Sequence, residues 1–447
     1  MTAAQSQPAD LIINASWIIP VVPAATVLND HSVVVKDKQI IALCPQSEII
    51  RFRAAETVNL PNHALIPGLV NAHGHSAMAL MRGIGDDLPL MQWLEKCIWP
   101  LEQEFVSREF VQQGSSLAMA EMIMSGTTTF ADMYFFPDEI GKVAQQARMR
   151  VQLASPVLDF PTAWAQDAEE YISKATRLHD DFRNSEFVNT AFGPHAPYTV
   201  SDEPLEKIAM LAEELDVPVH IHLHETAQEI KDALAHHGRR PLQRLADLGL
   251  LGPRLLCIHA TQLESNEMQL LSEQGASVIH CPESNLKLAS GYCEVARLHE
   301  QSVNVALGTD GGASNNDLDM FGEMQTAALL AKAVAADASA LPAHETLAMA
   351  TINGARALGM EASIGSLEVG KLADLTAVDL DHINTWPLHN PLSHLVYSAH
   401  ASQVSHVWCG GQALLVNGEL QSMDLALVRQ HAANWQQAMQ NKSFNEP

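Results

Sequence analysis

Short apolar runs recur along the middle of the chain and alternate with amphipathic stretches. We count eight such runs, at residues 64–75, 126–134, 150–158, 187–197, 217–225, 254–260, 276–284 and 303–312. The stretches between them, such as EPLEKIAMLAEELD and NEMQLLSEQG, repeat apolar residues at the three- and four-residue spacing of a helix that buries one face. Eight strands that alternate with helices predict an α/β fold with a closed, TIM-like (β/α)8 barrel. An open doubly wound sheet is the alternative, but no G-x-G-x-x-G follows the first run.

Both ends of the chain have a different sequence pattern, typical of short strands: they are rich in β-branched residues and are interrupted by Pro, Asp-Lys and Asn. These segments are residues 10–21, 32–44, 55–68, 365–380 and 404–420. Within each end of the chain, no strong helix lies between these segments, so we expect a small β-sandwich domain, residues 10–65 with 364–423, built from both chain ends. The barrel, residues 66–363, is then an insertion, and residues 424–447 form a C-terminal helix.

The charge balance limits the partners that the protein can have. The chain of 447 residues has 26 basic and 52 acidic residues, a net charge of −26 with histidine neutral. Such acidity argues against nucleic acid and anionic membranes as partners and favours a small neutral or cationic molecule. The N-terminal MTAAQSQPAD lacks the features of a signal peptide, and no segment approaches the ~20 apolar residues of a membrane span. We therefore expect a cytoplasmic protein.

The candidate chemistry lies where the apolar runs end. The first run ends in His73 and His75, which are two residues apart and therefore project from the same face of a strand. Four later runs end in His195, in His222 with Glu225, in His259, and in Asp310. In a closed barrel these ends meet at one mouth. Two imidazoles from one strand, joined by His222 and Asp310, suit one Zn²⁺ ion, with Fe²⁺ and Mn²⁺ as alternatives.

Each of these residues also has an ordinary structural interpretation. An H-x-H pair alone is common and can be the polar edge of a buried strand. In the fifth run, His220, His222 and His224 share one face, and any of them is a possible ligand, although the deep His220 suits a hydrogen-bonded core position. Asp310 and Glu225 follow strands, where both residue types also cap helices. The coincidence of such residues at several strand ends favours the metal site.

At these residues the sequence resembles the amidohydrolase superfamily, which carries an H-x-H on strand one, histidines on strands five and six, and an aspartate on strand eight. Within it, the chain is most similar to the 5′-methylthioadenosine/S-adenosylhomocysteine deaminases. The motifs that carry this similarity are residues 67–102, FGPHAPYT (192–199), HLHET (222–226), HCPESNLKLASG (280–291) and LGTDGGASNNDLDMF (307–321). Relatives with two metals have a carboxylated lysine at the end of strand four. Here GPHAP stands there, so the resemblance implies one divalent ion.

The resemblance assigns a role to each candidate residue. The implied metal ligands are His73, His75, His222 and Asp310. The implied catalytic residues are Glu225, His259 and Asp310, and the implied substrate-binding residues are Trp93, Glu102, His195 and Glu225. Deamination of adenine needs hydroxide at C6, a proton on ring N1 and a proton on the leaving amine, which suits these groups. Glu102 can accept hydrogen bonds from a ribose 2′,3′-diol. We also expect a homo-oligomer, a dimer or a tetramer.

One segment bears on the choice of nucleoside. Relatives that use S-adenosylhomocysteine have arginines after strand three, whereas residues 155–171 here contain four acidic residues and no Lys or Arg. An acidic loop repels a carboxylate, so we expect a preference for 5′-methylthioadenosine, unless Arg148, Arg150 or a neighbouring subunit substitutes. The expected pocket lining is PTAW (161–164) with Met81 or Met91. The alternatives are a guanine or cytosine deaminase, a triazine-ring hydrolase, and a scaffold protein without activity.

Overall fold

A computed structural model describes residues 6–440 of the chain. The chain divides into two compact units, which we describe separately. The first consists of Met1–Ala72, Met122–Thr129 and Asp319–Gln421, and the second of His73–Glu121, Phe130–Leu318 and Ser422–Pro447. Two sheets of eight strands each are formed by the described residues.

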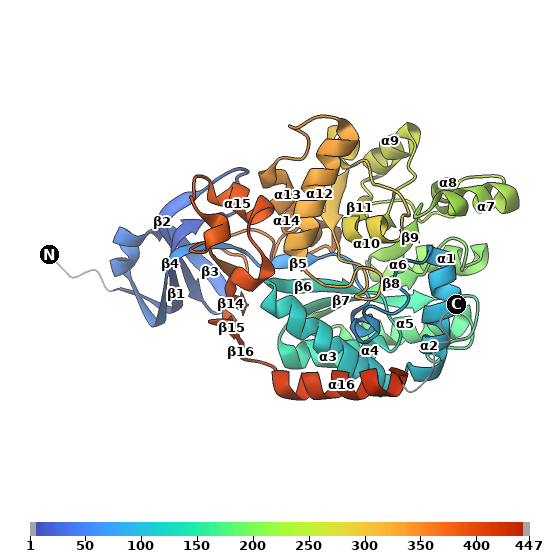
Figure 1. Ribbon diagram of the computed structural model, residues 1–447, viewed down its shortest axis with the longest axis horizontal. Helices are drawn as coiled ribbons and strands as arrows, with labels where there is room; N and C mark the ends of the chain where they lie inside the picture. Colours follow the sequence, from blue (N-terminus) through green and yellow to red (C-terminus); the bar gives the residue numbers. More distant parts are fainter. Residues whose placement is uncertain (1–5, 441–447) are drawn as a thin grey trace. The chain divides into compact units, whose positions relative to one another are not determined.

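The two ends of the chain, blue and red in Figure 1, build one mixed sheet. Its strand order is β16-β15-β14-β13-β4-β1-β2-β3. Its strands are β1 (Gln7–Ile18), β2 (Leu28–Lys36), β3 (Gln39–Pro45), β4 (Phe52–Pro67), β13 (Leu375–Asp379), β14 (Val404–Cys409), β15 (Gln412–Val416) and β16 (Glu419–Leu420). The two halves meet where β13 runs antiparallel to β4, with Leu375 opposite Pro67. One apolar cluster joins Ile13 and Leu65 from the first half to Leu375 and Trp408 from the second. Burial of these side chains explains why segments so distant in sequence form one domain.

The second sheet contains the parallel strands of the barrel, ordered β12-β11-β10-β9-β8-β7-β6-β5. They are β5 (Leu69–Asn71), β6 (Thr127–Asp132), β7 (Arg150–Val157), β8 (Val188–Pro194), β9 (Val219–Leu223), β10 (Leu255–His259), β11 (Ser277–His280) and β12 (Asn304–Leu307). Each lies inside one of the eight predicted runs, so the predicted barrel is confirmed. Its first and last strands meet just beyond their ends, at a parallel bridge between Gly74 and Asp310.

Gly68 separates the terminal sheet from the barrel strand β5. A Cβ at this position would lie 2.2 Å from Oγ1 of Thr128, so only glycine allows β6 to approach so closely. The first predicted run, residues 64–75, therefore contributes to both sheets: its start belongs to β4 and its middle to β5.

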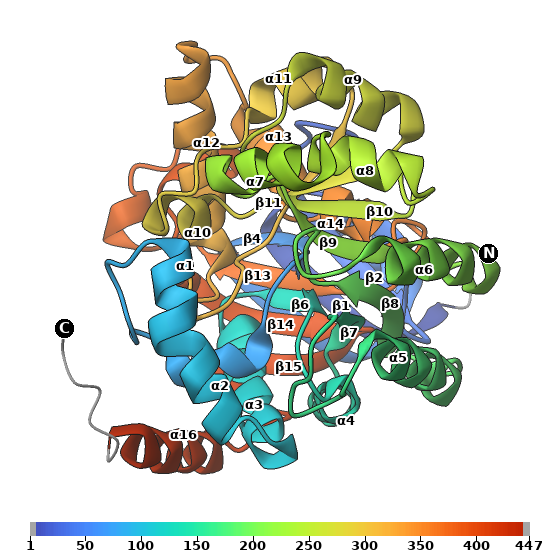
Figure 2. The same cartoon turned by 90° about the vertical axis from the view of Figure 1, so that its right-hand side faces the viewer.

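Helices α4 to α9 are arranged around strands β6 to β10 (Figure 2). They are α4 (Pro137–Ala147), α5 (Ala168–Phe182), α6 (Asp202–Leu215), α7 (Ala227–His237), α8 (Pro241–Asp247) and α9 (Ser265–Gln274). The two predicted amphipathic stretches are α6 and α9. Helix α6 buries Leu205, Ile208 and Ala212, at the predicted spacing of three and four residues.

The other helices include a broken one that follows β5. It consists of α1 (Leu90–Trp93), a π-helical turn at Leu94–Ile98, and α2 (Trp99–Phe105). The remaining helices are α3 (Arg108–Met124), α10 (Pro282–Lys287), α11 (Val295–Glu300), α12 (Met320–Ala335), α13 (Ala343–Met349), α14 (Ile352–Ala357), α15 (Pro391–Tyr397) and α16 (Leu425–Gln440).

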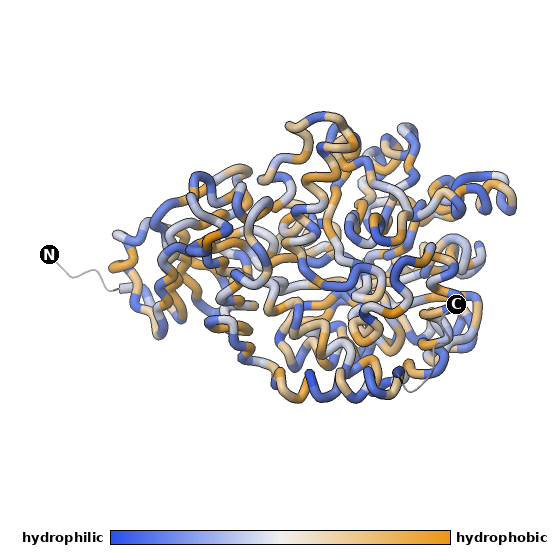
Figure 3. The backbone as a smooth tube through the Cα atoms, viewed as in Figure 1, coloured by the Kyte–Doolittle hydropathy of each residue, from blue (hydrophilic) through white to orange (hydrophobic). Residues whose placement is uncertain are grey.

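Hydrophobic and hydrophilic residues alternate along α16 (Figure 3), and Trp435 on this helix packs edge-on against Phe110 of α3, with 5.1 Å between ring centroids. Its indole Nε1 also donates to Oε1 of Gln113. No helix within residues 6–440 is long and apolar enough to cross a membrane. The predicted domain bounds stay a prediction, as does the part of the C-terminal helix beyond residue 440, which lies outside the described residues.

Candidate active site

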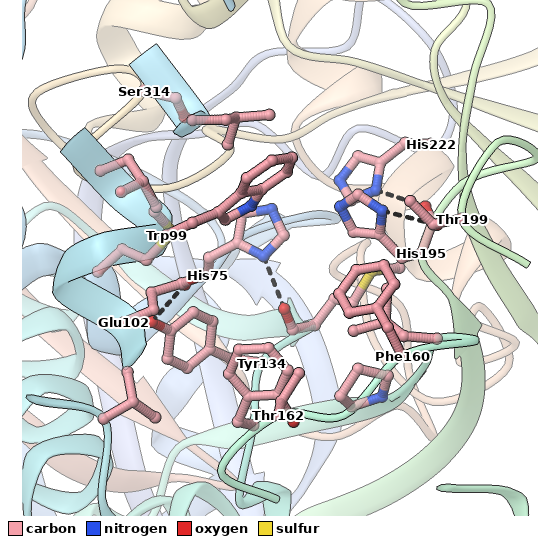
Figure 4. A pocket seen from close by; sticks show the side chains of 18 of the residues that line it. His75, Trp99, Glu102, Tyr134, Phe160, Thr162, His195, Thr199, His222 and Ser314 are labelled. Carbon is pink, nitrogen blue, oxygen red and sulfur yellow. Dashed lines mark hydrogen bonds between the residues drawn. The ribbon is translucent and has the colours of Figure 1, made fainter. Parts of the chain in front are cut away.

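One cavity, with a volume of about 620 Å³, lies at the carboxyl ends of the barrel strands. Each strand end that the sequence singled out reaches it. The predicted residues that line it are His75, Trp93, Glu102, His195, His222, Glu225, His259 and Asp310. His73 is fully buried directly beside this group, with its ring 4.8 Å from that of His75. Figure 4 shows His75 facing His195 and His222 across the cavity.

His73, His75 and Asp310 form a compact group of possible metal ligands. Oδ1 of Asp310 lies 3.1 Å from Nε2 of His75 and 3.6 Å from Nε2 of His73. The ring of His222 lies 5.0 Å from His73 and 5.4 Å from His75, measured between centroids. His73 also belongs to a second group of possible ligands, with His222 and His259. Histidine nitrogens and a carboxylate oxygen are donors that suit Zn²⁺.

Of the three histidines in the fifth predicted run, His222 belongs to a group of possible metal ligands, and His220 and His224 have other partners. Nε2 of His220 lies 3.2 Å from the side-chain amide oxygen of Gln152. His224 follows the last strand residue with a φ of 56°, which turns its ring away from the cavity. There its Nε2 accepts the backbone N–H of Leu242 at 3.1 Å. The three histidines were expected to share one face of the strand, but His224 lies beyond the end of β9 and does not share the face of His222.

Backbone oxygens fix the ring orientation of two of the presumed ligands. Nδ1 of His75 donates to the carbonyl oxygen of Met133 at 2.6 Å, and Nδ1 of His222 donates to that of His195 at 2.7 Å. Because a carbonyl only accepts, each Nδ1 carries a proton, and each Nε2 is the nitrogen that can bind a cation. On the carboxylate side, the Ser284 hydroxyl donates to Oδ2 of Asp310 at 2.6 Å. The residues present therefore fit a metal ion.

The electrostatics of the group also favour a cation. Burial alone would raise the pKa of Asp310, but its hydrogen bonds with His73 and His75 hold that pKa well below the usual range. Burial would lower the pKa of His75, yet the hydrogen bond and the charge of Asp310 raise it to about 9. Asp310 is thus an ionised carboxylate in a buried site, and it attracts positive charge.

The backbone is strained at two of these residues. His259 has a φ of 71° and Asp310 a φ of 62°, in the left-handed region that side-chain-bearing residues seldom adopt. Such conformations cost on the order of 1 to 3 kcal/mol each and persist where the surroundings enforce them. Here the backbone N–H of Asp310 is held by the carbonyl of His73 at 3.1 Å, which joins the first strand to the last.

Glu225 and His259 form a second pair deeper in the cavity. Nε2 of His259 lies 3.9 Å from Oε2 of Glu225, and Nδ1 of His259 lies 2.9 Å from the amide oxygen of Asn285. Burial raises the pKa of Glu225, because the charged form loses its water. The pKa of Glu225 is therefore shifted in the opposite direction from that of Asp310, so the two carboxyl groups favour different protonation states within one cavity.

Trp93 and Glu102 lie on the broken helix that follows strand β5. Trp93 ends α1, is 4% exposed, and donates its Nε1 hydrogen to the carbonyl oxygen of Ile84 at 3.2 Å. Glu102 lies on α2 and accepts a hydrogen bond from the Tyr134 hydroxyl at 2.7 Å. Burial raises the pKa of Glu102 to about 7. On the other side, Nδ1 of His195 lies 3.0 Å from Oγ1 of Thr199.

Sequence reasoning missed Tyr134, Ser284 and Asn285, which contact the candidate residues directly. Tyr134 ends the second predicted run, so the rule that selected the histidines also applied to it. Ser284 and Asn285 lie in the HCPESN motif, just after strand β11.

The expected lining of the cavity was partly wrong. Pro161, Thr162 and Ala163 do line it, but Trp164 packs on Tyr171 instead, with 5.6 Å between ring centroids. Met81 is fully buried elsewhere, and Met91 is 42% exposed and outside the lining. Met91 points away because the helix presents its other face to the cavity, through Leu90, Trp93 and Leu94.

Neither arginine offered as a substitute lines the cavity. Arg148 precedes strand β7 and Arg150 begins it, so both lie at the amino end of that strand. Arg150 donates to the carbonyl of Glu186 at 3.0 Å and its guanidinium lies over the ring of Phe187. Among residues 6–440, those that line the cavity include no Lys or Arg.

A (β/α)8 barrel with histidines and an aspartate at its mouth is typical of metal-dependent hydrolases. Residues 64–414 match the Amidohydrolase family, and the chain belongs to it. It is 51% identical over 434 residues to the 5-methylthioadenosine/S-adenosylhomocysteine deaminase of Saccharophagus degradans, covering 97% of each chain.

Two further relatives have names that refer to adenine nucleosides. The chain is 43% identical over 373 residues to the 5′-deoxyadenosine deaminase of Methanothermobacter thermautotrophicus, covering 82% of this chain and 86% of that protein. A crystal structure of an adenosine deaminase from Xanthomonas campestris with bound zinc is 51% identical, with a TM-score of 0.97. That comparison covers 98% of this chain and 100% of the other. The predicted resemblance is thereby confirmed.

Proposed function

We propose that the protein deaminates adenine nucleosides by hydrolysis and prefers 5′-methylthioadenosine, which it converts to 5′-methylthioinosine and ammonia. The observation that carries this proposal is the composition of one cavity. It joins a histidine-rich ligand group to a buried glutamate with a raised pKa, and its outer wall is apolar and without basic residues. The names of the relatives at 43% and 51% identity support the same activity.

The ligand group is His73, His75, His222 and Asp310, and we propose that it holds a single divalent ion, Zn²⁺ in preference to Fe²⁺ or Mn²⁺. Bound there, such an ion supplies Lewis acidity and lowers the pKa of water to about 7. The relative from Xanthomonas campestris contains zinc.

The two carboxyl groups then divide the proton transfers between them. The net reaction forms a C6–O bond, breaks the bond from C6 to the amino nitrogen, and releases ammonia. Asp310, which lies within the ligand group, accepts a proton from water and passes it to the departing amine. Glu225, with its raised pKa, holds a proton for ring N1, and His259 beside it stabilises negative charge on the incoming oxygen.

Three residues around the cavity recognise the nucleoside in this proposal. Glu102 accepts hydrogen bonds from the ribose hydroxyls, and the ring of Trp93 provides an apolar surface for the sugar. Burial lowers the pKa of His195 to about 4, so its imidazole is neutral at pH 7 and can hydrogen-bond the purine without adding charge.

The outer wall explains the preference for an uncharged 5′-substituent. It includes Leu158, Phe160 and Pro161 from the loop between β7 and α5, together with Leu94 and Ile98. A methylthio group gains from burial against such a surface. The carboxylate of S-adenosylhomocysteine would meet no Lys or Arg in this lining, which disfavours it.

An ammonia-release assay on one metal-analysed preparation tests this function. The substrates are 5′-methylthioadenosine, S-adenosylhomocysteine, adenosine and guanine. We expect turnover of the adenine nucleosides, the highest kcat/KM for 5′-methylthioadenosine, and about one metal ion per chain. No ammonia from any purine nucleoside would refute the activity, and a higher kcat/KM for S-adenosylhomocysteine would refute the preference alone. Turnover of guanine in place of the nucleosides would favour a free-base deaminase.

A further inference from the structure

Tyr134 and Glu102 meet inside the cavity, although they come from distant parts of the second unit. Tyr134 follows strand β6 directly, and Glu102 lies in the middle of helix α2. The Tyr134 hydroxyl donates to Oε1 of Glu102 at 2.7 Å, and both side chains line the cavity (Figure 4). Tyr134 is 4% exposed, and its hydrogen bond with Glu102 is part-buried.

We propose that Tyr134 is a positioning residue for recognition of the sugar: it holds one oxygen of the Glu102 carboxylate and thereby directs the other toward the ribose hydroxyls. This inference rests on the proposed function, because it assumes that the substrate is a ribonucleoside. It adds a residue to which neither the sequence analysis nor the function above assigns a role.

The chemistry of the two side chains supports this arrangement. A glutamate side chain has several rotatable bonds, and holding it in one rotamer costs conformational entropy when the substrate binds. Tyrosine is rigid, and its place beside the barrel strand fixes the hydroxyl before the substrate arrives. A carboxylate has two oxygens and about four lone-pair positions, so one oxygen can accept from Tyr134 while the other accepts from the sugar. Tyr134 also keeps its proton, because burial and the charge of Glu102 raise its pKa well above the usual value.

The alternative interpretation is that Tyr134 only fills space between the barrel and α2. Its ring does lie 6.5 Å from that of His75, measured between centroids, so a packing role is conceivable. The two interpretations differ in what they predict for nucleosides that lack a hydroxyl. A packing defect would lower activity on every substrate alike, whereas loss of positioning would lower it only on substrates with the hydroxyls that Glu102 binds.

The experiment measures kcat/KM of wild type and Tyr134→Phe on adenosine, 2′-deoxyadenosine, 3′-deoxyadenosine and 2′,3′-dideoxyadenosine. We expect the variant to lose about tenfold or more on adenosine, mainly through KM, and little on the dideoxynucleoside. The preference for the ribonucleoside over the dideoxynucleoside therefore falls by the same factor. The matched control is Tyr292→Phe, because Tyr292 is 49% exposed and lies outside the cavity lining. It should leave all four values unchanged.

Two further variants test whether Tyr134 acts through Glu102. In a Glu102→Ala background, Tyr134→Phe should reduce the ribose preference no further, since the group that it positions is gone. Glu102→Asp leaves Tyr134 in place but shortens the side chain, so the carboxylate cannot reach both the phenol and the sugar. It should lose ribose preference as Tyr134→Phe does, which keeps the test decisive if Tyr134→Phe is poorly folded.

An equal loss on all four nucleosides in Tyr134→Phe would overturn the inference, as would full ribose preference in Glu102→Asp. The proposed function fails in a different way, because wild type would then release no ammonia from any of the four. Turnover by wild type with an unchanged ribose preference in Tyr134→Phe would refute the role of Tyr134 only.

Discussion

The Asp310 carboxylate lies 3.1 Å from Nε2 of His75 through its Oδ1, and its Oδ2 accepts a hydrogen bond from Ser284. One carboxylate is thus fixed at both oxygens. Asp310→Asn keeps the size of the side chain and removes its charge, so we expect the metal content to fall at least tenfold and the deaminase activity to fall about a thousandfold or more. Elemental analysis and an ammonia assay on the same sample measure both effects. Full metal occupancy together with full activity would exclude Asp310 from the site.

Substitution of Glu225 should lower kcat without lowering the metal content. Its carboxyl lies 3.9 Å from His259 and its pKa is raised by burial, which suits a proton donor to the purine ring. We expect Glu225→Gln to lower kcat by about 10² to 10⁴, the usual contribution of a general acid, with metal content unchanged. Glu273→Gln, an exposed change on helix α9, is the control for the removal of a negative charge. A Glu225→Gln enzyme with wild-type kcat would contradict the proposed role.

The strand ends were predictable because a parallel barrel brings every carboxyl end to one mouth. Asp310 and His73 are 237 positions apart, yet the backbone N–H of one donates to the carbonyl of the other. The residues alone did not show that His222, and not His224, faces the cavity. The direction of the His224 ring depends on the positive φ of that residue and on its hydrogen bond with Leu242, which is distant in sequence.

The sequence also did not show which side chains of the broken helix after β5 face the cavity. A π-helical turn at Leu94–Ile98 shifts the helical phase between Trp93 and Glu102, so regular spacing does not say which residues face the cavity. Met91 was consequently placed in the pocket, while Leu90 and Leu94 line it. The oligomeric state and the cellular location stay predictions.

Glu229 is a further residue whose change should disturb the site indirectly. Its carboxylate accepts the backbone N–H groups of His224 at 2.9 Å and Glu225 at 2.7 Å, which holds the turn between β9 and α7. Glu229→Ala leaves two buried N–H groups without this acceptor, at a cost of about 1 to 3 kcal/mol each. We expect a lower Tm and about a tenfold loss in kcat, measured by thermal unfolding and the ammonia assay. Glu203→Ala, in the exposed first turn of α6, is the matched control, and an equal effect of both changes would refute a specific role.

Gln166 offers a direct test of the preference for an uncharged substituent. It lines the outer cavity on the loop after β7, and its side chain is exposed, so an arginine there can reach a ligand without being buried. Gln166→Arg supplies the cation that the lining lacks. A charge-assisted hydrogen bond to the homocysteine carboxylate is worth about 1.5 to 3 kcal/mol, so the kcat/KM for S-adenosylhomocysteine relative to 5′-methylthioadenosine should rise about tenfold. Gln166→Met changes the size similarly without adding charge and should leave the ratio unchanged. The rise should also shrink at high ionic strength, because salt screens an exposed pair. A ratio that stays constant in Gln166→Arg at low salt would show that charge in this loop does not select the substrate.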